Sequence, residues 1–210
     1  MKKLIISLCI LSGVFNLAHA AGDPEAGIPL TAVCAGCHSA DGNSAVGTFP
    51  KLAGQGEAYL LKQLQDIKSG NRVVVEMTGL LTNLNDQQLA DVAAYFSSQS
   101  IKVGQADPDL VDLGESLYRA GNADTGVPAC LGCHAVDGAG NSLAKFPALG
   151  GQHAQYVTNQ LNKFQKGYRA DAPSADARTN DGDAKIMRNI AFRLKDFEIE
   201  ALSSYIQGLH

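Results

Sequence analysis

One five-residue pattern, Cys-x-x-Cys-His, occurs twice in this chain and constrains its fold more than any other feature. The first copy begins at Cys34 and ends at His38, and the second begins at Cys130 and ends at His134. In each copy two residues separate the thiols, and the imidazole follows the second thiol directly. The chain therefore presents, at two places, a pair of reactive sulfurs beside a potential metal ligand.

This pattern is typical of the covalent attachment of a c-type haem. With two intervening residues, both sulfurs can reach the two vinyl groups on one edge of the porphyrin. The histidine that follows can then bind the iron through one ring nitrogen. The sequence therefore predicts two haems attached through four thiols, those of Cys34, Cys37, Cys130 and Cys133.

Zinc and redox chemistry are the alternatives for paired cysteines. A structural zinc needs four ligands, which the two cysteine pairs together could supply. A redox-active dithiol would normally follow a strand in a βαβ unit, and no run of alternating apolar residues indicates strands here. Neither site requires a histidine directly after the second cysteine in both copies, so haem attachment is the preferred interpretation.

The first twenty residues have the pattern of a secretory signal peptide. Lys2 and Lys3 precede the apolar residues 4–14, and Ala18-His19-Ala20 matches a cleavage site. A membrane anchor is the alternative, but the apolar run is short for a membrane span. We expect cleavage after Ala20 and a soluble product beyond the cytoplasmic membrane.

The chain expected after cleavage is acidic. Without the two lysines it carries 15 Lys and Arg against 21 Asp and Glu, a formal charge of −6. The basic surface needed to bind nucleic acid or an anionic bilayer is therefore not expected. Four cysteines remain and all belong to the two motifs, so no structural disulfide is predicted.

The similarity between the two halves extends well beyond the Cys-x-x-Cys-His motifs. Residues 49–55 and 146–152 share the pattern Phe-Pro-x-Leu-x-Gly-Gln, and each segment is followed at matching intervals by Tyr and Arg. Such self-similarity indicates duplication of one domain of about ninety residues. We expect a signal peptide at 1–20, one domain at 21–103 and another at 104–210, with a linker at about 100–111.

Both halves have helical periodicity, so the predicted fold class is all-α. Asp23-Pro24 is a typical helix start, and Asn85 with Gln88 matches a capping box. The middle helix of each half carries apolar residues at i, i+4 and i+7. These residues are Leu60, Leu64 and Ile67 in the first half and Val157, Leu161 and Phe164 in the second.

The second iron ligand decides between an electron carrier and an enzyme. After cleavage only two methionines remain, Met77 and Met187, and the repeat places them at equivalent positions. A lone methionine is usually a core gap-filler, but one per motif at matched positions favours axial ligation. We therefore predict His38 with Met77 and His134 with Met187; His153 aligns with a glycine and has no predicted ligand role.

Other matched residues are expected near each haem. The carbonyls of Pro50 and Pro147 are candidate acceptors for the free imidazole nitrogen of each histidine. Arg72 and Arg169 follow the middle helices and either pair with haem propionates or lie at solvated helix ends. Residues 170–183 contain a thirteen-residue excess in the second half, which we interpret as an inserted surface loop.

Taken together, these residues resemble the cytochrome c4 family, the dihaem branch of the class I cytochromes c. The resemblance covers nearly the whole chain after residue 20 and rests on both Cys-x-x-Cys-His motifs, both Phe-Pro-x-Leu-x-Gly-Gln segments and both methionines. It implies two helical cytochrome c domains, each wrapped around one covalently bound haem, with the propionate edges near the domain interface. It also implies the same four cysteine attachments and two His/Met pairs.

The resemblance further implies a periplasmic electron carrier with at most peripheral membrane association. Its redox partners would be a donor such as a quinol-oxidising complex and an acceptor such as a terminal oxidase. Two other functions stay open at this point. One is a dihaem enzyme, a peroxidase or dehydrogenase, which would need an open iron position. The other is an electron-entry subunit of a larger redox complex.

Overall fold

The computed structural model describes residues 22–210, and the expected signal peptide at 1–20 lies outside this range. Within it the regular structure is helical, and extended pairing is limited to isolated bridges such as Asn141 with Phe146. The all-α prediction is therefore confirmed. No helix in this range is long and apolar enough to cross a membrane.

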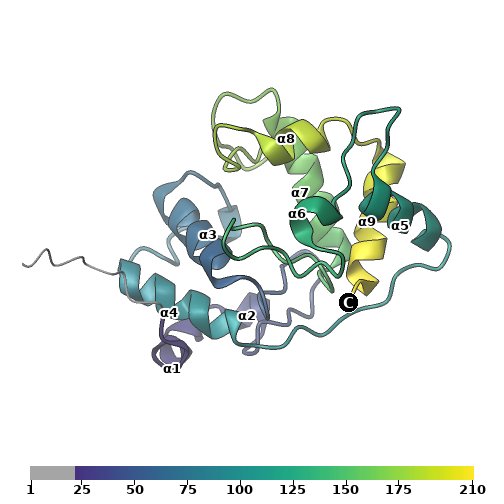
Figure 1. Ribbon diagram of the computed structural model, residues 1–210. Helices are drawn as coiled ribbons and strands as arrows, with labels where there is room; N and C mark the ends of the chain where they lie inside the picture. Colours follow the sequence, from purple (N-terminus) through teal and green to yellow (C-terminus); the bar gives the residue numbers. More distant parts are fainter. Residues whose placement is uncertain (1–21) are drawn as a thin grey trace, which may run out of the picture.

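The helices form two groups that repeat the same arrangement (Figure 1). We call the first group domain 1 and the second domain 2. The helices of domain 1 are α1 (Pro24–Gly27), η1 (Ile28–Thr31), α2 (Ala35–His38), α3 (Glu57–Ser69), η2 (Val75–Met77) and α4 (Asp86–Ser97). Those of domain 2 are α5 (Val111–Ala120), α6 (Leu131–His134), α7 (Ala154–Gly167), α8 (Ile186–Ala191) and α9 (Asp196–Gly208).

The helix ends follow the local chemistry that the sequence predicts. The Asp23 side chain accepts hydrogen bonds from the first backbone N–H groups of α1, with Pro24 at the first helical position. Asn85 and Gln88 form the predicted capping box of α4. Gly70 ends α3 in the left-handed conformation, which glycine adopts at little cost.

The last helix of each domain is the centre of its core. Helix α4 packs against α1 and α3, and α9 packs against α5 and α7. Their inward residues are almost fully buried, with Leu89 and Ala93 in α4 and Ile199 in α9 at most 1% exposed. Burying a leucine or isoleucine side chain contributes about 1.5–3 kcal/mol, so both helices contribute substantially to the stability of their domains.

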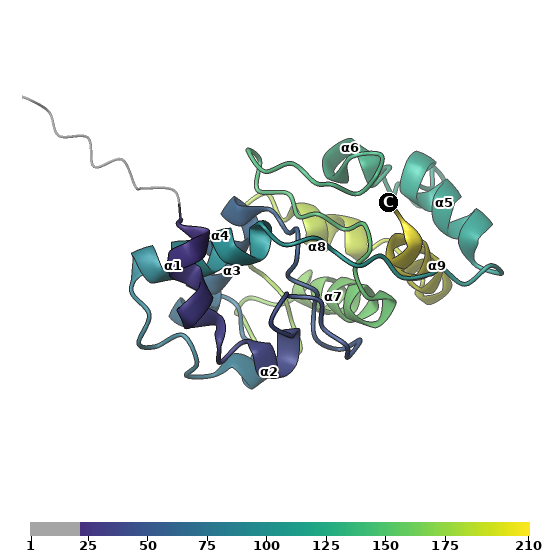
Figure 2. The same ribbon diagram turned by 90° about the horizontal axis from the view of Figure 1, so that it is seen from below.

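Each domain brings its first and last helices together (Figure 2), and in each a glycine lies at the crossing. A Cβ atom on Gly114 of α5 would lie 2.4 Å from the carbonyl oxygen of Ala201 and 2.5 Å from the Cβ of Tyr205 in α9. Gly27 of α1 meets Asp91 and Tyr95 of α4 in the same way. The close crossing is thus a repeated feature that requires a residue without a side chain.

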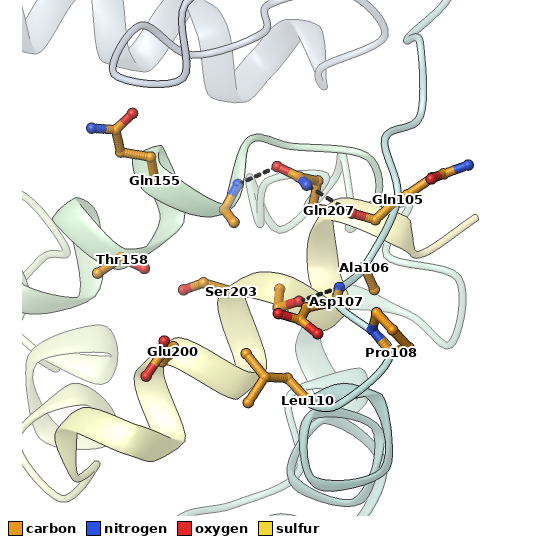
Figure 3. A pocket seen from close by; sticks show the side chains of 12 residues that line it. Gln105, Ala106, Asp107, Pro108, Leu110, Gln155, Thr158, Glu200, Ser203 and Gln207 are labelled. Atoms are coloured by element: carbon orange, nitrogen blue, oxygen red, sulfur yellow. Dashed lines mark hydrogen bonds between the residues drawn. The ribbon is translucent and has the colours of Figure 1, made fainter.

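The linker between the domains is held against domain 2 rather than left free. The backbone N–H of Gly104 donates to the carbonyl of Gln207, and that of Asp107 donates to the Ser204 hydroxyl. The Gln207 amide donates to the Gln105 carbonyl and accepts from the Ala154 N–H (Figure 3). These contacts run along α9 and fix where domain 2 begins to pack.

We predict that Gly114→Ala destabilises domain 2 by about 1–3 kcal/mol, the usual range for overpacking a tight contact. The added methyl group must push α5 away from α9, because backbone and Cβ atoms already occupy its position. Thermal denaturation of the holoprotein measures the change. Gly56→Ala is the matched control, since its φ is −53° and the nearest atom to a Cβ there, the Ser142 hydroxyl oxygen, lies 3.6 Å away, an ordinary contact distance; equal stability of the two variants would contradict the prediction.

Candidate haem-binding site

The two Cys-x-x-Cys-His motifs each form a single helical turn. In α2 the His38 N–H donates to the Cys34 carbonyl at 2.9 Å, and in α6 the His134 N–H donates to that of Cys130 at 3.0 Å. One turn of helix places residues i, i+3 and i+4 on the same side. Both thiols and the imidazole are therefore gathered on one face, as attachment of one haem requires.

The four thiols differ in exposure. Cys34 and Cys130 are partly buried, whereas Cys37 and Cys133 are exposed. Burial raises the pKa of the Cys130 thiol to about 11, and it also raises that of Cys34. Within residues 22–210 no pair forms a disulfide, so all four sulfurs are free to form thioether bonds.

A single cavity of about 780 Å³ runs between the two domains and reaches both motifs. Its lining is mostly apolar and includes core side chains of both domains. All the predicted attachment and ligand residues belong to this lining, namely Cys34, Cys37, His38 and Met77 from domain 1 and Cys130, Cys133, His134 and Met187 from domain 2.

Both histidines have one ring nitrogen occupied by a backbone carbonyl. His38 Nδ1 lies 2.9 Å from the Pro50 oxygen, and His134 Nδ1 lies 2.9 Å from the Pro147 oxygen. The predicted proline acceptors are therefore confirmed. Burial lowers the pKa of both imidazoles, although the carbonyl contact opposes this effect. Each ring is thus held neutral at neutral pH with Nε2 free, which is the form that binds a metal.

Phe49 and Phe146 lie beside the two motif histidines. Each ring is only partly buried and lies against the motif histidine of its own domain, with ring centroids 6.3 Å apart in both domains. Both aromatic rings also line the cavity. They therefore restrict the tilt of the imidazoles on the side of the attachment motif.

The two methionines reach the cavity from different local structures. Met77 ends the short helix η2, whereas Met187 lies in the first turn of α8. A buried ion pair stabilises the segment of Met187 but not that of Met77. In this pair, Asp181 accepts from the backbone N–H of Arg188 at 2.9 Å and from its guanidinium Nε at 2.6 Å. The inserted loop thus braces the residue next to Met187, and domain 1 has no equivalent pair in the described residues.

Arg72 lies in the cavity, but Arg169 does not. The Arg72 guanidinium donates to Gln63 of its own domain and to Tyr156 and Gln160 of domain 2, at 2.8–3.1 Å. Arg169 is exposed at the end of α7, where its guanidinium lies 5.3 Å from the centroid of the Phe192 ring. The sequence left a propionate contact and a solvated helix end open for both arginines; Arg169 lies at an exposed position outside the cavity lining, although it matches Arg72 in the sequence repeat.

Arg178 takes the place expected of Arg169. It is 8% exposed and donates to Tyr59 and Gln63 of domain 1 and to Gln160 of its own domain, each at 3.0 Å. Its position mirrors that of Arg72, which bonds to Tyr156 and to the same two glutamines. Residues 170–183 are therefore not only a surface insertion, because the loop delivers Arg178 to the domain interface.

The two interface arginines are charges without an anionic partner in the described chain. Within residues 22–210 neither Arg72 nor Arg178 forms an ion pair; Asp66, whose charge helps to raise the pKa of Arg72, pairs with Lys62. Arg178 is buried and Arg72 is half-buried, and a cation that is shielded from water and bonded to neutral amides and hydroxyls is costly unless an anion approaches it. The carboxylates of haem propionates are suitable anions, so the cavity, its sulfurs, its imidazoles and its cations fit two haems.

Sequence reasoning missed the residues that join the domains. These are Gln55 and Gln152 of the repeated segments, Gln63 and Gln160 of the middle helices, and Arg178 and Asn180 of the inserted loop. The glutamines recur at equivalent positions of the repeat, which is a visible signal. No such repeat signal marks Arg178, because it lies in the inserted residues and has no counterpart in the first half.

Comparison with known proteins agrees with this geometry. The family model described as Cytochrome c matches residues 26–100 and again residues 111–210. A protein named cytochrome c4 from Pseudomonas aeruginosa is 59% identical over the full length of both chains. The crystal structure of reduced recombinant cytochrome c4 from Pseudomonas stutzeri, 58% identical, superimposes with a TM-score of 0.85 over 90% of this chain and 100% of that chain.

A more distant relative has a different name. It is the thiosulfate dehydrogenase electron acceptor of Stutzerimonas stutzeri, 35% identical, and the match covers 86% of this chain and 81% of the relative. Two matches to the Cytochrome c model, together with full-length similarity to proteins named cytochrome c4, establish the relationship. The chain therefore belongs to the cytochrome c4 family, with two cytochrome c domains that each carry one covalently bound c-type haem.

Proposed function

We propose that this protein is an electron carrier in which each haem iron is bound by one histidine and one methionine. Cys34 and Cys37 attach the first haem, and Cys130 and Cys133 attach the second. The iron ligands are His38 with Met77 and His134 with Met187. The observation that carries this proposal is that all eight side chains line one cavity, with the Nδ1 atom of each histidine already bound to a proline carbonyl.

A c-type haem supplies one reversible electron per iron. The chain contributes two axial ligands to each iron, which leaves no position for a substrate and disfavours the enzyme alternative. The soft methionine thioether favours the reduced state and raises the potential. The buried histidines and the apolar lining limit rearrangement between the two oxidation states, which suits rapid transfer of single electrons.

Arg72 and Arg178 are proposed to hold the haem propionates at the domain interface. Both are bonded to side chains of the opposite domain, so each is already placed before an anion is present. A fixed positive charge beside the propionates favours the reduced haem, because reduction removes one positive charge from the iron.

We propose a periplasmic location, on the basis of the signal peptide predicted at 1–20. The proposed donor is a quinol-oxidising complex and the proposed acceptor is a terminal oxidase of a respiratory chain. The acidic composition of the chain is consistent with protein partners and at most peripheral membrane association.

A second candidate donor is a thiosulfate-oxidising dehydrogenase. It is favoured by the relative named thiosulfate dehydrogenase electron acceptor, which matches most of this chain. Stopped-flow reduction of the oxidised protein by each purified donor separates the two candidates. We expect rapid reduction by the quinol-oxidising complex, and rapid reduction by the dehydrogenase alone would favour the second donor.

We predict that Met77→His lowers the midpoint potential of the first haem only. A harder nitrogen ligand stabilises ferric iron, and axial ligands set haem potentials over a range of about 0.8 V. Potentiometric titration followed in the visible spectrum measures both haems. The wild type should show two low-spin haems at positive potential. An unaltered titration of the variant would exclude Met77 as ligand. A high-spin haem in the wild type would instead favour the enzyme alternative.

We predict that Arg178→Leu lowers the potential of at least one haem, whereas Arg169→Leu leaves both unchanged. The shift equals the difference in the arginine's electrostatic interaction with the oxidised and the reduced haem, on the order of 1 kcal/mol or about 40 mV for one electron. Arg169 is the matched control because it lies on the same connection but is exposed. Equal titrations of the two variants would remove Arg178 from the propionate site.

A further inference from the structure

Each axial histidine is connected by hydrogen bonds to a glutamine of the other domain. In domain 1, the peptide unit between Pro50 and Lys51 takes part in two bonds. Its carbonyl oxygen accepts from His38 Nδ1 at 2.9 Å, and its N–H donates to Gln152 Oε1 at 2.9 Å. A continuous path therefore runs from the imidazole of domain 1, through a single peptide group, to a side chain of domain 2.

The same path occurs in the opposite direction. The peptide unit between Pro147 and Ala148 accepts from His134 Nδ1 at 2.9 Å, and its N–H donates to Gln55 Oε1 at 2.7 Å. Each glutamine makes a second bond to the same residue. The side-chain NH₂ group of Gln152 donates to the Lys51 carbonyl, and that of Gln55 donates to the Ala148 carbonyl, both at 2.9 Å. Each domain thus binds, through one glutamine, the peptide group that accepts a hydrogen bond from the histidine of the other domain.

The proline and the glutamine of each path come from the two copies of the Phe-Pro-x-Leu-x-Gly-Gln segment. Its proline carbonyl serves the histidine of its own domain, and its glutamine serves the other domain. The participating side chains are shielded from water: His38 and His134 are 7% exposed, Gln55 is 7% exposed and Gln152 is 6% exposed. In such an environment hydrogen bonds are stronger than in water, and each bond polarises the next.

Polarisation along this path has a defined sign. When the peptide N–H donates to a glutamine oxygen, electron density shifts toward the peptide carbonyl oxygen, which becomes a better acceptor for the histidine Nδ1–H. A stronger bond at Nδ1 makes Nε2 a more basic ligand. A more basic ligand stabilises ferric iron and lowers the potential.

We propose that Gln152 and Gln55 are positioning residues that lower the potential of the haem in the opposite domain. This inference rests on the proposed function, since it takes His38 and His134 as the iron ligands. It deepens that function by making each potential depend on contact between the domains. A movement that separates the domains weakens both paths at once and raises both potentials.

Other contacts across the interface do not have this property. His153 Nε2, for example, lies 2.7 Å from the Ser44 carbonyl, but no bond links that peptide to an axial histidine. A glutamine that only holds the domains together would affect both haems alike. A glutamine that acts through the histidine peptide affects the opposite haem more, and this difference makes the proposal testable.

The test is Gln152→Leu, made in two ligand-variant backgrounds that identify the haems. Met187→His moves the second haem to low potential and leaves the first as the high-potential wave, and Met77→His does the reverse. Gln152→Leu should raise the high-potential wave in the Met187→His background and leave it unchanged in the Met77→His background. Gln55→Leu should give the reversed pattern.

A second readout reports the histidine bond directly. In the reduced, diamagnetic protein, nuclear magnetic resonance of ¹⁵N-labelled histidine follows the Nδ1–H proton. Gln152→Leu should move the His38 resonance to lower frequency, as for a weaker hydrogen bond, and leave that of His134 in place. Gln207→Leu is the matched control, because that glutamine also accepts from one backbone N–H and donates to one carbonyl, but at the linker.

Several results overturn the proposal. They are an unmoved potential of the first haem, an equal shift of both haems, or the same shift in the Gln207 control. If Gln152→Leu does not yield a holoprotein, Gln55→Leu decides the question on the second haem by the same criteria. Failure of the proposed function is recognised separately, since Met187→His and Met77→His alone would then leave both potentials unchanged.

Discussion

The structure depends on an apolar cavity that neither domain closes with its own side chains. Leu60, Val92 and Phe96 belong to the core of domain 1 and also line the cavity, as do Val157, Leu202 and Ile206 for domain 2. Protein interiors are close-packed, and an unfilled space beside core residues costs stability. The haems therefore belong to the hydrophobic core of each domain as well as serving as redox centres.

The interface between the domains is polar and specific where the cavity is apolar. Four glutamines and two arginines make most of its side-chain hydrogen bonds, and their partners are peptide groups, phenols and amides of the opposite domain. Such bonds contribute modest net stability but strongly penalise a shifted arrangement that leaves buried groups unpaired. The interface therefore sets the relative position of the haem pockets more than it adds free energy of folding.

The duplication is asymmetric in the inserted loop, and this asymmetry concerns the segment that carries Met187, the proposed second ligand of its iron. The inserted loop brings Arg178 and Asn180 across to domain 1 and places Asp181 against Arg188 beside Met187. Domain 1 presents Met77 on a short 3₁₀ turn without this support. Two halves with the same ligand types thus differ in how firmly the methionine segment is held, which gives the two haems different surroundings.

Much of this protein was determined by local sequence. Helix starts at Asp23 and Asn85, the attachment motifs, the paired methionines and the proline carbonyls all follow from short-range stereochemistry or from the repeat. The repeat gives Arg169 and Arg72 equal sequence spacing, but this spacing does not give them equal positions in space. The insertion lies between Arg169 and Met187, and the loop folds back so that Arg178 enters the interface instead.

Tertiary structure alone decided how the two domains meet. Gln152 bonds to the peptide of Pro50 and Lys51, about one hundred residues away, and no periodicity reports such a contact. A repeat specifies what each domain contains, because both copies obey the same local rules. It does not specify which side chains pair across the interface, since those pairs depend on the rotation between two rigid bodies and on how completely their buried polar groups are satisfied.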